Sequence, residues 1–382
     1  MTSKLSEHVS SLVSSLVTAG ITAIHPYEPG KPIEEVEREL GSALPPGGVV
    51  KLASNENPLG PSPRALEAVR AVLPKVHLYP DGGSFYLRRK LAQVHGTSEH
   101  EVALGNGSNE ILDLLVRTFC VAGDEVLAPA QTFVCYKLAA QAHGVIYKEA
   151  PRGPDFAYRL DALAAAVTPK TKIVFLASPD NPTGVYARKD EVVKLLRSLP
   201  PNVVVAIDEA YFEYATAADY PDCLSLRGEH ALLVVMRTFS KIYGLAGLRC
   251  GYAIAPREIV DYLNRVRNPF NVSAVAQVAA LAALDDHEHV ARSRAMNAEG
   301  MAQIEEGLGR LRIPFIPSQC NFILTDVSPR DGREVFSALL RKGVIVRPMS
   351  GYGMPRALRV TIGTPDENRR FLAALGEVLA KA

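Results

Sequence analysis

The sequence predicts an α/β protein whose mostly parallel central sheet is covered by helices on both faces, followed by a smaller α+β unit. The chain has 382 residues, 47% of them apolar and 22% charged, which is enough for two or three domains with ordinary globular cores. From residue 64 to about residue 255, short runs rich in Val and Ile alternate with segments of helical period. These runs lack a regular polar face, which is typical of parallel strands buried on both sides.

Composition excludes several classes of function. Lys and Arg number 42 against 41 acidic residues, and the net charge of +1 indicates neither a nucleic-acid partner nor a membrane surface. No apolar run approaches the roughly 20 residues of a membrane-spanning helix. The five cysteines are odd in number and include no Cys-x-x-Cys pair, so we expect neither a disulfide framework nor a metal site. A cytoplasmic protein fits this pattern best.

Residues 1–54 are expected to form an N-terminal helix and arm that pack with the small domain or with a partner subunit. Apolar residues recur here at helical offsets, at Leu5, Val9, Leu12, Val13, Leu16 and Val17. A Pro-rich stretch, 24–32, predicts an extended arm, because proline pushes the residue before it toward extended conformations. A short helix at 33–40 and a strand at 49–53 follow.

Residues 55–270 are expected to form the large domain. Its predicted strands are Val102–Leu104, Glu125–Ala128, Val145–Lys148, Lys172–Ala177, Asn202–Ile207, Ala231–Arg237 and Gly251–Ala255. Helical periods lie between them, for example at Ile111–Cys120, Tyr136–Ala142 and Glu191–Arg197. In such sheets ligands bind at the carboxyl ends of the strands, and there the polar motifs of this chain fall.

Residues 271–382 are expected to form the small domain. Long helical periods, 272–284 and 289–308, begin it. The rest mixes strands and helices, with predicted strands at 321–325, 344–347 and 358–362, a helix at 332–342 and a last helix from residue 366.

The stretch from residue 237 to 251 carries the strongest chemical signal. Lys241 leaves an apolar run that reads as a buried strand, and burial beside other cations lowers the pKa of an amine and makes it a nucleophile toward aldehydes. Thr238, Ser240 and Arg249 supply hydroxyl and guanidinium donors suited to a phosphate. A lysine that condenses with an aldehyde beside a phosphate seat indicates pyridoxal 5′-phosphate held as a Schiff base.

Two earlier strand ends fit the same ligand. Ser108 or Asn109 is expected to cap the helix that follows 105–107, where free N–H groups and the helix dipole favour an anion. Glu110 stands where a dinucleotide fingerprint needs glycine, and no Gly-Lys-Ser/Thr follows, so nicotinamide and P-loop sites lose support. Phe133 follows the next strand and could stack on a flat ring or belong to the core.

Two further strand ends complete the set. Asn181 lies between prolines in a turn, held as a donor for a ligand oxygen would be. Asp208 leaves the next strand, where a carboxylate would keep a pyridine nitrogen protonated or would simply cap a helix. Tyr211 could join Asn181 at the ring hydroxyl. Agreement between so many separate stretches is itself evidence for one site.

With these residues in view, the chain resembles the class II aminotransferases among the fold-type I pyridoxal-phosphate-dependent enzymes, and is most similar to the histidinol-phosphate aminotransferases. The similarity spans nearly the whole length, in the segments 26–35, 52–58, 79–82, 178–184, 208–211, 240–241 and 246–251. It implies transamination of L-histidinol phosphate with 2-oxoglutarate, giving imidazole acetol phosphate and glutamate in histidine biosynthesis. It also implies small-molecule amino donor and 2-oxo acid partners and a homodimer.

The resemblance further implies roles for individual residues. Lys241, Asp208 and Tyr211 would be catalytic. The cofactor would be bound by Ser108, Asn109, Phe133, Asn181, Asp208, Tyr211, Thr238, Ser240, Lys241 and Arg249, and the substrate by Tyr27, Arg347 and Arg359. The chain departs from many relatives at Asn57-Pro58-Leu59, because they carry nearby a Tyr that reaches the neighbouring subunit's cofactor phosphate.

The residues leave other functions open. An aromatic-amino-acid aminotransferase is the nearest alternative, since Phe, Tyr and histidinol phosphate differ mainly in ring and distal anion. A pyridoxal-phosphate-dependent decarboxylase of an amino-acid phosphate, a pyridoxal-phosphate-binding regulator and a nicotinamide dehydrogenase are weaker ones. A regulator would need a fused DNA-binding segment, which is not seen.

Overall fold

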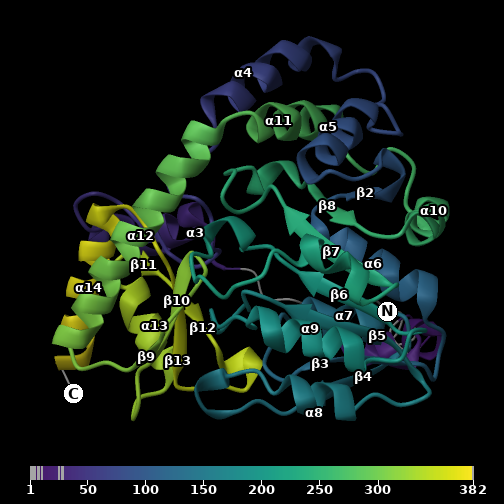
Figure 1. Ribbon diagram of the computed structural model, residues 1–382. Coiled ribbons are helices and arrows are strands. Elements are labelled where there is room, and N and C mark those ends of the chain that lie inside the picture. The colour runs from purple at the N-terminus through teal and green to yellow at the C-terminus, as the bar shows by residue number, and fades with distance from the viewer. Residues whose placement is uncertain (1–5, 7–8, 10–11, 25, 27–29, 381–382) are drawn as a thin grey trace.

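The computed structural model describes residues 6, 9, 12–24, 26 and 30–380, and its largest element is a seven-stranded sheet (Figure 1). The strands are β2 (Val102–Gly105), β3 (Glu125–Pro129), β4 (Ile146–Ala150), β5 (Thr171–Ala177), β6 (Val204–Asp208), β7 (Leu233–Thr238) and β8 (Gly251–Ile254). Their order across the sheet is β2-β8-β7-β6-β5-β3-β4.

The sheet is mostly parallel, as the sequence predicts. Strands β4, β3, β5, β6 and β7 pair in parallel, whereas β8 runs antiparallel to both of its neighbours, β7 and β2. All strands but β8 therefore end at the same edge, and β8 begins there. The observed bounds differ from the expected ones by one or two residues, for example at β6 and β7, which begin at Val204 and Leu233.

Both faces of the sheet are buried except at the edge strand β4, because alternate residues of the other strands enter two separate hydrophobic clusters. In β6, Val205 and Ile207 belong to one cluster, and Val204 and Ala206 belong to the other. Helices of the first cluster are α4 (Pro63–Val72), α5 (Phe85–His95), α8 (Leu160–Ala165), α9 (Lys189–Ser198) and α11 (Ala274–Leu284). Helices of the second are α6 (Ser108–Phe119), α7 (Cys135–Ala142) and α10 (Arg257–Val266).

A second, antiparallel sheet lies in the C-terminal part of the chain. It consists of β12 (Arg347–Pro348), β13 (Ala357–Thr361), β10 (Phe322–Asp326) and β9 (Phe315–Ile316), in that order. Its core is shared with α12 (His287–Arg310), α13 (Gly332–Leu340) and α14 (Pro365–Ala380). In Figure 1 these elements form the part of the molecule that carries the yellow C-terminal chain.

The strand expected at 344–347 is interrupted. Strand β11 (Val344–Ile345) pairs in parallel with β1 (Val50–Lys51), whereas β12 starts at Arg347 and pairs with β13. The two halves thus belong to different sheets, and Val346 lies between them. Through β1, a segment near the N-terminus joins the small sheets.

The packing of α11 differs from the expected division at residue 271. This helix packs against α4 and α5, and its residues Ala276, Ala279 and Ala283 lie in the core of the large sheet. The long helix α12 then leads from this region to the small sheets (Figure 1). The packing therefore changes along α12 and not before α11.

The N-terminal residues contact both parts of the chain. Helix α2 (Ala19–Thr22) packs against α7, and its Gly20 lies so close that a Cβ there would be 2.3 Å from the carbonyl oxygen of Gln141. Helix α3 (Ile33–Leu40) packs instead through Val36 on Ile345 of the small part. Across the described ranges, we find no helix long and apolar enough to cross a membrane.

Short 3₁₀ helices complete the structure. They are η1 (Gly41–Ala43), η2 (Leu73–Lys75), η3 (Glu99–Glu101), η4 (Pro154–Phe156), η5 (Phe212–Tyr214), η6 (Cys223–Glu229), η7 (Ala246–Leu248) and η8 (Ser350–Tyr352).

Candidate active site

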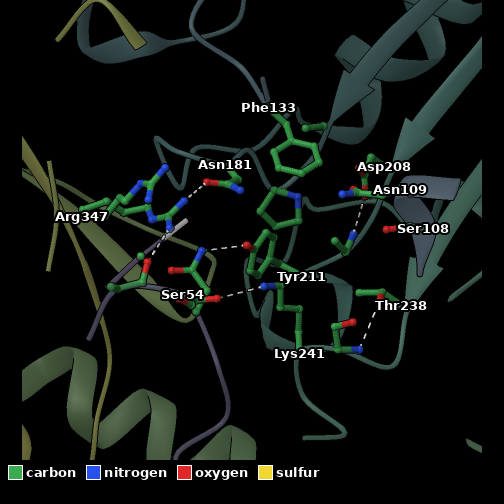
Figure 2. Close-up of a pocket in the computed structure, with 18 of the residues that line it drawn as sticks. Ser54, Ser108, Asn109, Phe133, Asn181, Asp208, Tyr211, Thr238, Lys241 and Arg347 are labelled. Carbon is green, nitrogen blue, oxygen red and sulfur yellow. Dashed lines mark hydrogen bonds between the residues drawn. The ribbon is translucent and has the colours of Figure 1, made fainter. Parts of the chain in front are cut away.

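A cavity opens at the edge where the parallel strands end, and the structure brings nearly all of the sequence-predicted site residues to its wall. They are Ser108, Asn109, Phe133, Asn181, Asp208, Tyr211, Thr238, Ser240, Lys241, Arg249, Arg347 and Arg359 (Figure 2). They come from several strand ends of the large sheet and from two strands of the small one. Tyr27, the remaining predicted residue, lies outside the described residues.

One end of the cavity is a cradle of N–H and hydroxyl donors at the N-terminus of α6. The Arg249 guanidinium donates to Ser240 Oγ over 3.3 Å, and the Ser240 N–H donates to Thr238 Oγ1 over 3.1 Å. Position 251, beside this cradle, requires glycine, since a Cβ there would lie 2.3 Å from the Ser108 nitrogen. Such a cradle fits a phosphate group, because a helix N-terminus and a guanidinium both favour an anion.

The capping role expected of Ser108 or Asn109 is wrong. Gly107 occupies the N-cap position with φ 76°, and Ser108 is the first helical residue. A side chain at 107 would displace Arg249, because its Cβ would lie 2.4 Å from Arg249 Nη2. Glycine thus lets the guanidinium approach the backbone, and the side chains of Ser108 and Asn109 remain at the cavity wall.

Lys241 lies between the cradle and the small sheet. Its Nζ donates to the backbone oxygen of Ser54 over 3.3 Å (Figure 2). Burial, followed by the positive charge of Arg359, lowers the pKa of Lys241 to about 8. A sizeable fraction of this amine is therefore neutral near pH 8 and able to act as a nucleophile or base.

Asp208 ends β6 deep in the cavity. Its Oδ2 accepts a hydrogen bond of 3.0 Å from the Tyr136 hydroxyl, and its Oδ1 accepts one of 3.1 Å from the Ala210 N–H. Burial raises the pKa of Asp208 to about 6, although both hydrogen bonds lower it. A buried carboxylate is costly unless a cationic group contacts it, and a protonated ring nitrogen would supply one.

Three more predicted side chains face the same space. Phe133 lines the cavity and is held edge-to-face by Tyr136, with ring centroids 5.7 Å apart. Tyr211 accepts a hydrogen bond at its hydroxyl oxygen from Asn55 Nδ2 over 2.8 Å. Asn181 accepts one at Oδ1 from Arg359, so its amide nitrogen stays available for a ligand.

The two predicted substrate arginines are direct cross-strand neighbours. Arg347 on β12 is the register partner of Arg359 on β13. Like charges placed opposite each other destabilise a sheet unless an anion lies between or beside them. Arg359 is buried, and within the described part of the chain its Nε has no hydrogen-bond partner. The pair is therefore suited to bind an anionic group that enters the cavity.

Sequence reasoning missed the segment formed by Ala53, Ser54 and Asn55 as part of the site. The backbone oxygen of Ala53 accepts a 2.8 Å hydrogen bond from Arg359 Nη2, Ser54 contacts Lys241, and Asn55 contacts Tyr211. Three consecutive residues thus connect the small sheet to the floor of the cavity. In the sequence these residues only spanned the predicted division between residues 54 and 55.

Comparison with known proteins agrees with this geometry. The sequence model of the family described as aminotransferase class I and II matches residues 47–375. The chain belongs to the class I and II aminotransferases. The resemblance drawn from the motifs is thereby confirmed.

Relatives of this aminotransferase match it along nearly its whole length. It is 52% identical over 364 residues to the histidinol-phosphate aminotransferase of Anaeromyxobacter sp. strain Fw109-5, covering 95% of this chain and 99% of that protein. It is 50% identical over 366 residues to histidinol-phosphate aminotransferase 2 of Pseudomonas aeruginosa, covering 96% and 98%.

Solved structures confirm the fold of the aminotransferase. The crystal structure of histidinol-phosphate aminotransferase from Sinorhizobium meliloti, in complex with pyridoxal-5′-phosphate, superposes with a TM-score of 0.85 at 28% identity. The superposition covers 96% of this chain and 98% of the other. The mostly parallel sheet with a smaller antiparallel one is therefore the aminotransferase fold expected from the motifs.

Proposed function

We propose that this aminotransferase binds pyridoxal 5′-phosphate and transfers the amino group of L-histidinol phosphate to 2-oxoglutarate, giving imidazole acetol phosphate and glutamate. The observation that carries the proposal is the identity of 50% and 52%, over nearly the full chain, with two histidinol-phosphate aminotransferases. The cavity supports it, because a lysine of lowered pKa, a buried carboxylate and a phosphate cradle line the same cavity.

The cofactor fits the residues present. We assign its phosphate to Ser108, Asn109, Thr238, Ser240 and Arg249, whose donors converge at the start of α6. The close approach of Gly107 to Arg249 and of Gly251 to Ser108 supports this assignment, since either Cβ would close the cradle.

We assign the ring of the cofactor to the residues on the deeper wall of the cavity. Phe133 stacks on it, Asp208 pairs with its nitrogen, and Asn181 and Tyr211 bind its phenolic oxygen. The raised pKa of buried Asp208 and the available amide nitrogen of Asn181 support these roles.

Bound pyridoxal phosphate supplies an aldehyde and an electron-withdrawing ring that stabilises negative charge on the substrate carbon. In our proposal Lys241 would hold the cofactor through its aldehyde carbon. Its neutral Nζ would serve as the base that takes a proton from the substrate carbon bearing the amine and delivers a proton to the former aldehyde carbon of the cofactor. Proton transfer by a positioned base contributes roughly 10²–10⁴-fold to such a step. Asp208 would keep the ring nitrogen protonated.

One pocket has to accept a phosphate monoester and then a dicarboxylate. Arg347 and Arg359 can serve both, because a guanidinium binds phosphate or carboxylate through two parallel hydrogen bonds. Their register pairing on β12 and β13 keeps the two charges on one face of the small sheet. The expected phosphate contact of Tyr27 remains a sequence-based prediction.

The test is a panel of amino donors with 2-oxoglutarate. We expect the highest kcat/KM with L-histidinol phosphate and low values with phenylalanine and tyrosine. A preference for the aromatic amino acids would replace this proposal by an aromatic-amino-acid aminotransferase. In the same assay, Lys241→Ala should abolish turnover and the absorbance of the covalently held cofactor, and retained activity would contradict the role of Lys241.

We also propose that two copies of the chain associate. Large apolar side chains of the segment that joins α4 to α5 are exposed, with Val76 59%, Leu78 58% and Tyr79 84% accessible. The N-terminal apolar stripe is exposed as well, including Leu16 at 83%. Groups of large exposed apolar side chains are typical of surfaces that another chain covers. Light scattering should give twice the mass of one chain, and a monomer at micromolar concentration would contradict the proposal.

A further inference from the structure

We propose that Asn55 is a positioning residue that fixes the direction of the Tyr211 hydroxyl, so that Tyr211 donates its proton into the cavity. The acceptor would be the phenolic oxygen of the cofactor ring. This inference rests on the proposed function, because the acceptor belongs to the proposed cofactor. Asn55 itself need not touch the reacting atoms.

Asn55 is held in place by burial and by hydrogen bonds to distant parts of the chain. It is 1% exposed and has a φ of 56°, in the left-handed region that asparagine tolerates better than most residues. Its side-chain nitrogen donates to the Tyr211 hydroxyl oxygen over 2.8 Å, and its backbone oxygen accepts from Asn321 Nδ2 over 3.0 Å. Both contacts join segments far apart in the sequence.

Thr361 determines which way the Asn55 amide points. The Asn55 N–H donates to Thr361 Oγ1 over 2.9 Å, and Thr361 Oγ1 in turn donates to Asn55 Oδ1 over 3.1 Å. If the amide were reversed, the Thr361 hydroxyl, in a side chain only 4% exposed, would have no acceptor among the described residues. A buried donor without an acceptor is costly, so the amide nitrogen faces Tyr211.

The direction of the Tyr211 proton also follows from counting hydrogen-bond donors and acceptors. The amide nitrogen of Asn55 can only donate, so the Tyr211 oxygen must be the acceptor of that bond. The single hydroxyl proton of Tyr211 therefore points elsewhere. In the described chain it has no other protein partner, and Tyr211 lines the cavity. A ligand oxygen that carries negative charge is the acceptor such a donor binds best.

The small sheet thereby controls a group on the large one. Thr361 belongs to β13 and Asn321 immediately precedes β10, whereas Tyr211 follows β6. Thr361 orients the Asn55 amide, Asn321 holds the Asn55 backbone oxygen, and the amide donates to Tyr211. Correct docking of the small sheet is thus a condition for the hydroxyl to donate.

Two substitutions separate direction from packing. Asn55→Asp keeps shape and tolerates the left-handed backbone, but its oxygen would accept the Tyr211 proton and turn it away from the cavity. Asn55→Gly removes the side chain without backbone strain and leaves the hydroxyl free to rotate. If Asn55 only fills space, the isosteric Asn55→Asp would be the milder change. If it sets direction, Asn55→Asp is the more severe one.

The measurement is the dissociation constant, by titration calorimetry, of pyridoxal 5′-phosphate and of 3-deoxypyridoxal 5′-phosphate, which lacks the phenolic oxygen. The ratio of the two constants isolates the contact at that oxygen, because a new charge at position 55 acts on both ligands. Tyr211→Phe defines the ratio without the hydroxyl. Thr361→Val removes the group that orients the amide, and Thr361→Ser, which keeps the hydroxyl, is its matched control.

We expect the wild-type protein to bind the complete cofactor about tenfold more tightly than the deoxy analogue, as for one charge-assisted hydrogen bond. The ratio should fall in Asn55→Asp to the value of Tyr211→Phe, fall less in Asn55→Gly, fall in Thr361→Val and stay within about twofold of wild type in Thr361→Ser.

A wild-type ratio in Asn55→Asp together with a collapsed ratio in Tyr211→Phe would overturn the inference and leave the cofactor site intact. An unchanged ratio in Tyr211→Phe would instead overturn the role of Tyr211, and this inference with it. Absence of binding to the wild-type protein would overturn the proposed function itself.

Discussion

The phenol of Tyr136 donates a 3.0 Å hydrogen bond to Oδ2 of Asp208, at the bottom of the cavity. Tyr136 is completely buried and its ring stacks on Phe175, with centroids 4.6 Å apart and an interplanar angle of 1°. The hydroxyl is therefore held in place by packing on the large sheet. It stabilises the ionised form of a carboxylate whose pKa burial raises to about 6.

Tyr136→Phe should weaken binding of pyridoxal phosphate by about tenfold, because a hydrogen bond to a charged group is lost and the pKa of Asp208 rises further. The loss should grow as the pH falls from about 8 to about 5.5, since a protonated Asp208 cannot form an ion pair with a ring nitrogen. Calorimetric titration across this pH range measures it. Tyr252→Phe is the control, because the hydroxyl of that buried Tyr contacts His95. An equal loss in both variants would contradict the prediction.

Arg359→Ala should reduce kcat/KM for both the amino donor and 2-oxoglutarate by about 2–4 kcal/mol of transition-state stabilisation, because both carry an anion. Steady-state kinetics of the two half-reactions measures this. Part of the loss reflects the hydrogen bond from Arg359 to the Ala53 backbone, so urea unfolding should accompany the kinetics. The exposed Arg356, on the approach to the same strand, is the control. Unchanged KM for both substrates would argue against the role of Arg359.

Gly107→Ala should destabilise the protein by about 1–2 kcal/mol through its φ of 76° and, in addition, weaken cofactor binding by displacing Arg249. Gly123→Ala is a matched control, because its φ is 94° and a Cβ there would meet no atom of the described residues within 4 Å. Urea unfolding should show a similar loss in both variants. Only Gly107→Ala should raise the dissociation constant of pyridoxal phosphate. Equal binding by both would mean that the Arg249 contact does not shape the cradle.

Glu213 should make the protein less stable as the pH rises. Burial raises the pKa of this carboxyl to about 7, against about 4.5 for a free Glu, so the folded state binds more protons between these values. Stability then falls from about pH 4.5 to about pH 7 and stays low above it. Glu213→Gln should be roughly 1–3 kcal/mol more stable than wild type at about pH 8 and equal to it near pH 4.5.

Chemical denaturation at several pH values tests this prediction. Glu67→Gln on the exposed face of α4 is the control, and it should leave the pH dependence unchanged. A stability difference for Glu213→Gln that does not vary with pH would contradict the assignment.

The sequence was sufficient to predict which residues meet at the cavity, because parallel strands end at one edge of a sheet. Strand periodicity placed Asp208 and Lys241 at this edge, whereas their roles were predicted from side-chain chemistry and from the resemblance. The same reasoning could not find Asn55, whose partners Tyr211 and Thr361 are 156 and 306 residues away. The spacing of apolar residues carries no information on hydrogen bonds between residues so far apart in the sequence. For Tyr136 the sequence predicted only the start of a helix, and nothing in it indicated the contact with Asp208.

The division of the chain was harder to predict for a related reason. Helix α11 is apolar all round, so its sequence shows no single face that would tell which sheet it covers. The apolar run continues through Val346, and only the pairing of β11 with β1 and of β12 with β13 separates the two strands. A local sequence pattern does not show which distant strands pair with each other.

The order of the site along the chain bears on how the protein is made. The residues assigned to the cofactor lie between positions 108 and 249, whereas the arginine pair that faces the substrate comes from β12 and β13, at 347 and 359. During synthesis the last residue assigned to the cofactor is therefore added about a hundred residues before the first arginine of the pair. The arginine pair is thus the last part of the proposed site to be synthesised.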